Sequence, residues 1–325
     1  MAWPVTAQTT DPALRKEFAK RLENAERRLP DASPDTQALR NYALYPYLQA
    51  ARLRAGIDGA QGQTDADVAG FLGQHGDALW TRDLRRRWLT DLADRHQWPL
   101  FLQHYDAQRA NDALRCHRLS ALIATRPDVD LRSELQAVWR SGKQLPKACI
   151  PPFDWMKAQG WRGAEETALR ARLALENGET GLADWLIRAL PQPQYTHLKL
   201  WLSTLKNPAQ HLPSAVKAGL EPQIIFAAFA RLARQSTHSA SQTLRSIEAI
   251  CGQPCTLQSP ATPGELRREI ALNLSWSRKP EALRLFRQIP LAALDERGHE
   301  WRIRAALWAG DIDTKTIGLK YIICS

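Results

Sequence analysis

The sequence predicts an all-α protein: an irregular α-superhelix, or solenoid, of short stacked helical hairpins. Apolar residues recur at intervals of three and four along most of the 325 residues, which is the period of an amphipathic helix. The segments with this period are short, numerous and consecutive, and Gly, Pro or Asn-Gly ends most of them. No stretch shows the β-branched alternation of a strand. A compact all-α globule is the alternative arrangement of the same helices.

The first predicted helix begins at Asp11, whose side chain can cap it, and Pro12 suits its first position. Its apolar residues follow at spacings of four, four, three and four: Leu14, Phe18, Leu22, Ala25 and Leu29. Pro30 ends this helix. The next segment, 36–55, contains Pro46, which we expect to kink or split it.

Short helices joined by tight turns follow in the same pattern. We expect them at 65–74, 79–95, 98–105, 110–125, 131–141, 149–159, 164–176, 181–189, 195–205, 210–218, 222–235, 239–251, 262–276, 279–287 and 295–309. Five tryptophans lie beside apolar neighbours at helical spacing, and we expect their rings between helices: Trp88, Trp98, Trp139, Trp155 and Trp185.

Composition excludes several classes of protein. The chain is 44% hydrophobic, which is enough to bury a core and excludes wholesale disorder. No apolar run approaches the roughly 20 residues that a membrane-spanning helix needs. The net charge of +10 is diffuse. Arg85 to Arg87 beside Trp88, the pair Arg267 and Arg268, and Arg284 can bind phosphates or form solvated helix faces. Because carboxylates are interspersed with them, we expect no nucleic-acid partner.

The search for catalytic chemistry finds no motif. Glycine-rich phosphate loops, H-E-x-x-H and G-x-S-x-G are all missing from the sequence. Glu165 and Glu166 stand in the first turn of a predicted helix, where the macrodipole favours carboxylates, and neighbouring helical residues do not face each other. Cys251 and Cys255 form a C-x₃-C without a second ligand pair nearby. We therefore predict no catalytic, cofactor-binding or metal-binding residue, and no cofactor.

The two ends of the chain differ from its body. Val5-Thr6-Ala7, followed by Gln8, has the small residues that a signal peptidase needs, but charged and apolar regions do not precede them. Residues 1–10 are therefore either the remnant of a signal peptide or a polar tail. Residues 312–325 hold four Ile, two Lys and no Arg, although Arg dominates the body. We interpret them as an unrelated tail, with a frameshift or truncation near Asp311; a natural short tail is the alternative.

Several segments, in order, resemble the N-terminal superhelical U-domain of soluble lytic murein transglycosylases of Gram-negative bacteria. They are LYPYLQAARL (44–53), DVAGFLGQHGD (67–77), LRRRWLTDLADRHQWPLFLQHY (84–105), LRCHRLSAL (114–122), VWRSGKQLPKACIPPFDWMKAQG (138–160) and LRARLALENGETGLADWL (169–186). Their order and spacing agree with the family, and the resemblance covers about residues 11–311 as one superhelical U-type domain.

The resemblance implies a periplasmic protein that acts on peptidoglycan (murein), with signal-peptide cleavage between Ala7 and Gln8. The family breaks the β-1,4 bond between N-acetylmuramic acid and N-acetylglucosamine without water, using one glutamate first as acid and then as base. That glutamate belongs to a separate lysozyme-like domain whose signature begins with Glu-Ser, a pair that does not occur here. The resemblance therefore implies a scaffold, truncated before the catalytic domain and inactive alone, that meets murein through the full-length enzyme. The alternative is a free-standing α-solenoid interaction module for a protein, glycan or nucleic acid.

The resemblance also carries a cysteine at the positions of Cys116 and Cys149, so we expect these two to pair in an oxidising periplasm. Cys251 and Cys255 are a weaker disulfide candidate. A helix that continues through both would keep their sulfurs apart, whereas a turn at Gly252 and Pro254 would allow a bond. Two separate thiols are the alternative there.

Overall fold

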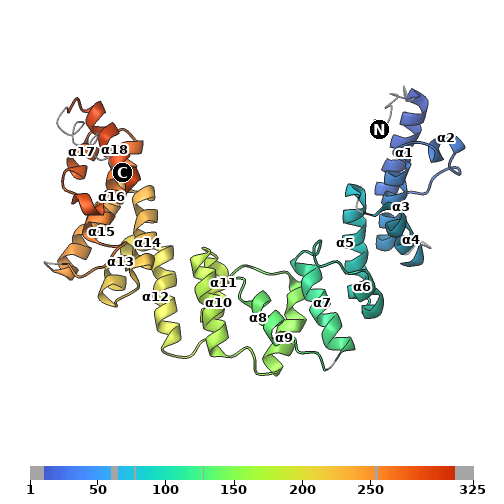
Figure 1. Cartoon of the computed structure of the whole chain (residues 1–325), viewed down its shortest axis with the longest axis horizontal. Helices are drawn as coiled ribbons and strands as arrows, with labels where there is room; N and C mark the ends of the chain where they lie inside the picture. The colour runs from blue at the N-terminus through green and yellow to red at the C-terminus, as the bar shows by residue number, and fades with distance from the viewer. Residues whose placement is uncertain (1–10, 60–64, 77, 127, 253–254, 312–325) are drawn as a thin grey trace, which may run out of the picture. The chain divides into compact units, whose positions relative to one another are not determined.

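The computed structural model describes residues 11–59, 65–76, 78–126, 128–252 and 255–311. Over these residues the protein is all-α, with eighteen α-helices, two 3₁₀-helices and no strand (Figure 1). The tails that the sequence singles out, 1–10 and 312–325, lie outside the described residues. None of the helices within the described ranges combines the length and the apolar character that crossing a lipid bilayer demands.

The chain forms two compact units, one of residues 1–136 with 145–159 and the other of residues 137–144 with 160–325. Inside each unit, a helix packs mainly against the next one or two helices along the chain. Stacking between sequence neighbours is the arrangement of an α-solenoid, in contrast to a globule in which distant helices meet. The predicted fold class, short hairpins stacked in an irregular α-superhelix, is therefore confirmed.

The first unit contains helices α1 (Pro12–Glu26), α2 (Gln37–Arg40), α3 (Tyr45–Gly59), α4 (Asp65–His75), α5 (Leu79–Asp94), α6 (Trp98–His104), α7 (Asp112–Thr125), η1 (Lys147–Cys149) and α9 (Ile150–Ala158). The carboxylate of Asp11 caps α1 by accepting from the backbone N–H of Ala13 at 2.9 Å. The segment 36–55 is split as expected. Pro46 stands second in α3, where its missing N–H costs no helical hydrogen bond.

Helix α5 supplies the centre of the first unit's core. Trp88 and Leu92 are fully buried, and Phe101 of α6 is buried with them in the same apolar cluster. The indole N–H of Trp88 donates to Asp65 at 2.8 Å, so this buried polar group keeps a partner. One side of α5 is fixed in this way, and its basic side is left facing out.

The second unit contains α10 (Ala164–Glu176), α11 (Thr180–Ile187), α12 (Gln194–Lys206), α13 (Pro208–Lys217), α14 (Pro222–Gln235), α15 (Thr237–Cys251), α16 (Pro263–Trp276), α17 (Glu281–Phe286), η2 (Leu291–Ala293) and α18 (Glu296–Trp308), while α8 (Arg132–Trp139) runs across the boundary of the units. Helix α16 starts with a capping box, in which Thr262 and Glu265 satisfy each other's backbone N–H. It is also the most deeply buried helix of the last stack, between α14, α15, α17 and α18.

The tryptophan prediction is right for some rings and wrong for one. Trp88 and Trp139 are buried, and Trp98 and Trp155 are partly buried. Trp185, in contrast, is 62% exposed. Helix α11 buries Leu182, Ala183, Leu186 and Ile187, and this face turns position 185 outward. The prediction that the Trp185 ring lies between helices is therefore wrong, because apolar neighbours in the sequence do not determine which side of α11 is buried.

Candidate functional site

Both cysteine pairs are joined in the structure. Cys116 of α7 is bonded to Cys149 of η1, and Cys251 at the end of α15 is bonded to Cys255, with Cα atoms 4.8 Å apart in each pair. This separation lies within the range of about 4.4–6.8 Å usual for disulfides. Gly252, at φ +74°, ends α15 immediately after Cys251, whereas Pro254, the other residue of the expected turn, lies outside the described residues.

The carboxylates that the sequence singles out are engaged by separate partners. Glu165 accepts from the side-chain amide of Gln194 at 2.9 Å, whereas Glu166 forms an ion pair with Arg140. The two groups therefore do not act as a carboxylate pair. Across the described ranges, no group of three or more His, Cys, Asp or Glu side chains converges in a way that could hold a metal ion.

Most of the arginines noted in the sequence are neutralised by neighbours. Arg86 and Arg87 share Asp83 on the same helix, and Arg267 pairs with Glu248. Arg268 donates to the backbone carbonyl of Ala293 at 3.0 Å. These contacts explain why much of the positive charge serves structure: each guanidinium ties one helix turn or one neighbouring helix.

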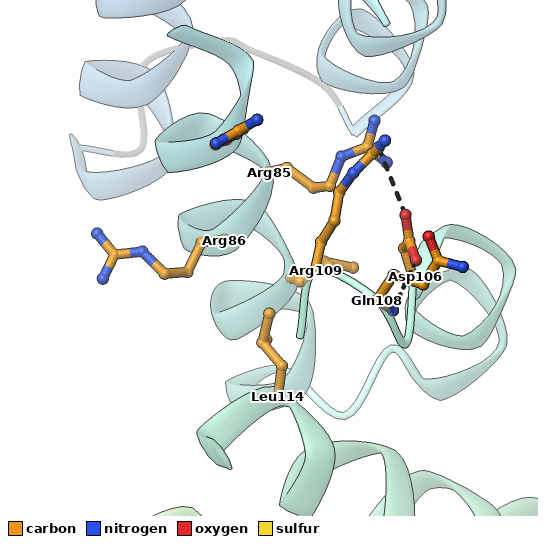
Figure 2. A pocket seen from close by; sticks show the side chains of 8 residues that line it. Arg85, Arg86, Asp106, Gln108, Arg109 and Leu114 are labelled. Atoms are coloured by element: carbon orange, nitrogen blue, oxygen red, sulfur yellow. Dashed lines mark hydrogen bonds and ion pairs between the residues drawn. The ribbon is translucent and has the colours of Figure 1, made fainter. Parts of the chain in front are cut away.

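Arg85, together with Arg82 and Arg86 on the same helix, lines a hollow of about 310 Å³ in the first unit (Figure 2). We call this space the basic hollow. Helix α5, the connection between α6 and α7, and the start of α7 surround it with Arg82, Arg85, Arg86, Leu89, Asp106, Gln108, Arg109 and Leu114. Four of these eight residues are arginines and one is an acid, so the hollow is strongly cationic.

Helix geometry and one turn arrange these charges. Arg82, Arg85 and Arg86 stand three and four positions apart on α5, which places them along one side of the helix. Arg109 comes from the opposite wall, and Figure 2 shows it reaching into the same space as Arg85. Asp106 fixes that wall, since its carboxylate lies 3.4 Å from the Arg109 guanidinium and accepts from the backbone N–H of Gln108 at 2.9 Å.

The local electrostatics reflect the excess of positive charge. Among the residues that the structure describes, Arg82 and Arg85 have no acidic partner within ion-pair distance, and Arg85 is only partly exposed. Burial, together with the charge of Arg85, lowers the pKa of the neighbouring His104. A guanidinium that is partly desolvated and lacks a counter-ion is positioned to receive an anion.

The basic run noted in the sequence includes Arg85 and Arg86, but Arg82, Asp106 and Arg109 were not predicted to join them. The spacing of Arg82 and Arg85 on one helix is a local signal that could have been used. Arg109 carries no such signal, since its approach to α5 depends on how α6 and α7 fold back.

A second charged surface lies at the last helices of the second unit. The indole rings of Trp276, Trp301 and Trp308 meet in sequence, with ring centroids 6.1 and 6.2 Å apart. Arg297 and Arg304 lie over two of these rings, 4.6 and 4.7 Å from their centroids. Trp308 is 50% exposed. We call this surface the tryptophan–arginine cluster.

The sequence is similar to those of known bacterial proteins. No protein-family model matches the sequence. The chain is 27% identical to the soluble lytic murein transglycosylase of Escherichia coli K12 over 212 residues, which are 64% of this chain and 32% of that protein. The corresponding protein of Salmonella typhimurium LT2 is 26% identical over 212 residues, with the same shares of the two chains. The chain thus spans about a third of the length of the curated relatives it matches.

Solved structures agree with the sequence matches. An inactive mutant of the lytic transglycosylase Slt from Pseudomonas aeruginosa aligns with 91% of this chain and 47% of its own, at a TM-score of 0.59 and 27% identity. The 70 kDa soluble lytic transglycosylase of Escherichia coli aligns with 94% of this chain and 55% of its own, at a TM-score of 0.60 and 21% identity, and so supports the fold. The resemblance found in the sequence is therefore confirmed: the chain is homologous to soluble lytic murein transglycosylases.

Proposed function

We propose that this chain is a scaffold part of a peptidoglycan lytic transglycosylase and that by itself it binds murein without cleaving it. The observation that carries the proposal is the similarity to soluble lytic murein transglycosylases, at 27% identity in both the sequence match and the aligned structure of Slt. The net charge of +10 favours a polymer that carries carboxylates.

The chemistry of the family's reaction supports the proposal that the chain alone does not cleave murein. The general acid that cleaves a glycosidic bond must be a carboxyl group with a raised pKa, and the substrate must be able to reach that group. Burial raises the pKa of Glu269, but this residue is only 7% exposed and lies 3.6 Å from the guanidinium of Arg268 inside the second unit. A buried, paired carboxyl of this kind cannot donate a proton to a wall polymer.

We propose a periplasmic location for the same protein. The two disulfides fit an oxidising compartment, since cytosolic reductants keep such pairs as thiols. The Val-x-Ala pattern before Gln8 supports cleavage of a signal peptide.

Co-sedimentation with purified sacculi tests the proposal. We expect the chain to pellet with sacculi at low salt, to be released as salt screens the charges, and to leave no anhydromuropeptides above a no-protein control. Insoluble cellulose, a neutral glycan, is the control polymer. Anhydromuropeptide release would overturn the non-cleaving assignment. A chain that stays in the supernatant at low salt would overturn murein binding and favour the alternative of an interaction module for another partner.

A further inference from the structure

We propose that the basic hollow is an oxyanion site that holds a carboxylate of a murein stem peptide through Arg82, Arg85 and Arg109. The proposal rests on the murein-binding function above and adds the place and the chemical group of one contact. The hollow belongs wholly to the first unit, so its geometry depends on α5, α6 and α7 alone.

The charge balance inside the hollow is the first argument. Arg82 and Arg85 have no acidic partner among the described residues, whereas Arg86 and Arg87, on the same helix, share Asp83. Removing a guanidinium from water without an anion is unfavourable, and Arg85 is partly buried. A bound carboxylate would supply the missing counter-charge, and its two oxygens match the fork of a guanidinium.

Preorganisation is the second argument. Asp106 holds Arg109 at 3.4 Å and the following turn through the Gln108 N–H at 2.9 Å, so the wall opposite α5 is fixed before a ligand arrives. Figure 2 shows Arg85 and Arg109 reaching into the space between these walls. Guanidinium groups that are already in place lose less side-chain entropy on binding.

Size and lining define the ligand further. A volume of about 310 Å³ lies at the lower end of the range of about 300–1,000 Å³ for small-molecule sites. Leu89 and Leu114, which are 1% and 4% exposed, give the hollow an apolar base. The side-chain amide of Gln108 adds a donor and an acceptor that suit a peptide group. This combination fits a carboxylate on a short peptide better than a whole disaccharide.

Binding of a soluble muropeptide to the intact chain tests the proposal. The probe is a disaccharide–tripeptide with free stem carboxylates, and the comparison ligand is the same molecule with those carboxylates amidated. We expect the amidated ligand to bind at least tenfold more weakly, and we expect the Arg85→Gln/Arg109→Gln variant to lose at least tenfold in affinity for the free carboxylate. The matched control is Arg87→Gln, on the same helix but outside the hollow, for which we expect less than a twofold change.

The imidazole of His104 gives a second readout that does not depend on affinity. Because Arg85 is one cause of its lowered pKa, an anion bound at Arg85 should raise the His104 pKa in an NMR titration, and Arg85→Gln should raise it without ligand. A ligand that binds the chain but leaves this pKa unchanged would place the site elsewhere and overturn the proposal.

The outcomes separate this proposal from the broader function. If the wild-type chain ignores sacculi, the murein-binding function itself is wrong. Suppose that the wild-type chain binds sacculi and muropeptide, that the double variant binds the muropeptide as tightly as the wild type, and that the amidated ligand binds as tightly as the free one. Only the assignment of the basic hollow is then refuted. Inorganic phosphate at matched ionic strength forms a further arm. Binding of phosphate as tight as that of the muropeptide would overturn the assignment to a stem carboxylate.

Discussion

Removing the bond between Cys116 and Cys149 should cost the first unit several kcal/mol of unfolding free energy. The two residues are 33 positions apart, and closing a loop of that size lowers the entropy of the unfolded chain by an amount worth roughly 3.7 kcal/mol at 25 °C. The bond between Cys251 and Cys255 closes a separation of only 4, for which the same relation gives roughly 1.9 kcal/mol. The two bonds therefore form a matched pair within one chain.

The assay compares the Cys116→Ala/Cys149→Ala and Cys251→Ala/Cys255→Ala variants in urea unfolding and thermal melts. We expect the first variant to lose about twice as much unfolding free energy as the second. In the melt of a unit of this size, the first loss corresponds to roughly 7–15 °C. Adding a reductant to the wild-type chain should reproduce the combined loss and should leave a variant without either bond unchanged.

Two results would refute the reasoning. A loss below about 1 kcal/mol for Cys116→Ala/Cys149→Ala would mean that the unfolded chain gains little freedom when the loop opens. Equal losses for the two variants would show that the chain-entropy relation does not rank these loops. In that case the buried sulfurs of Cys116 and Cys149, 0% and 1% exposed, would contribute through packing instead.

Three further predictions concern local structure. In chemical unfolding, Gly142→Ala should destabilise the protein by roughly 3 kcal/mol, and Gly160→Ala by about 1 kcal/mol. Both glycines have positive φ, but of the two only Gly142 has a backbone atom within 2.8 Å of where a Cβ would stand. A hydrogen bond from Arg52 is the largest cause that lowers the pKa of Asp35 to about 2. This ion pair therefore stabilises the fold above pH ~4, and its contribution is lost as the pH falls toward 2. Asp35→Asn should cost roughly 2 kcal/mol of unfolding free energy at pH 7 and much less at pH 2. Thr262→Ala should cost about 1 kcal/mol in the same assay, because it removes the capping box of α16.

Local signals were enough to predict the helices. The range 164–176 matches α10 residue for residue, because Gly163 and Asn177-Gly178 bracket a clear apolar period. Pro46 predicted the split of the segment 36–55, and it stands second in α3, where a proline needs no hydrogen bond. A solenoid favours this kind of prediction, because most contacts of a helix are made with neighbours in the sequence.

Side-chain exposure and the basic hollow were harder to predict, because both depend on which face of a helix meets the next one. Trp185 has apolar neighbours on α11, but it lies outside the buried face of that helix and is exposed to solvent. Nothing in the sequence distinguishes Arg109 from the other arginines, because only the fold of the connection between α6 and α7 brings it to α5. Only the part of the site on a single helix, Arg82 and Arg85, follows from spacing alone.

The fold connects the disulfide to the basic hollow. Leu114 forms part of the hollow's base, and Cys116 lies two residues later on the same helix, where its bond to Cys149 ties α7 to the segment that follows in the first unit. In a stack of neighbours, each helix is held by few partners, so this covalent tie stabilises the position of α7 against η1, whereas α7 meets α5 through non-covalent packing. Oxidation therefore stabilises the helix that carries Leu114, while α5 places Arg85 and the ion pair with Asp106 places Arg109.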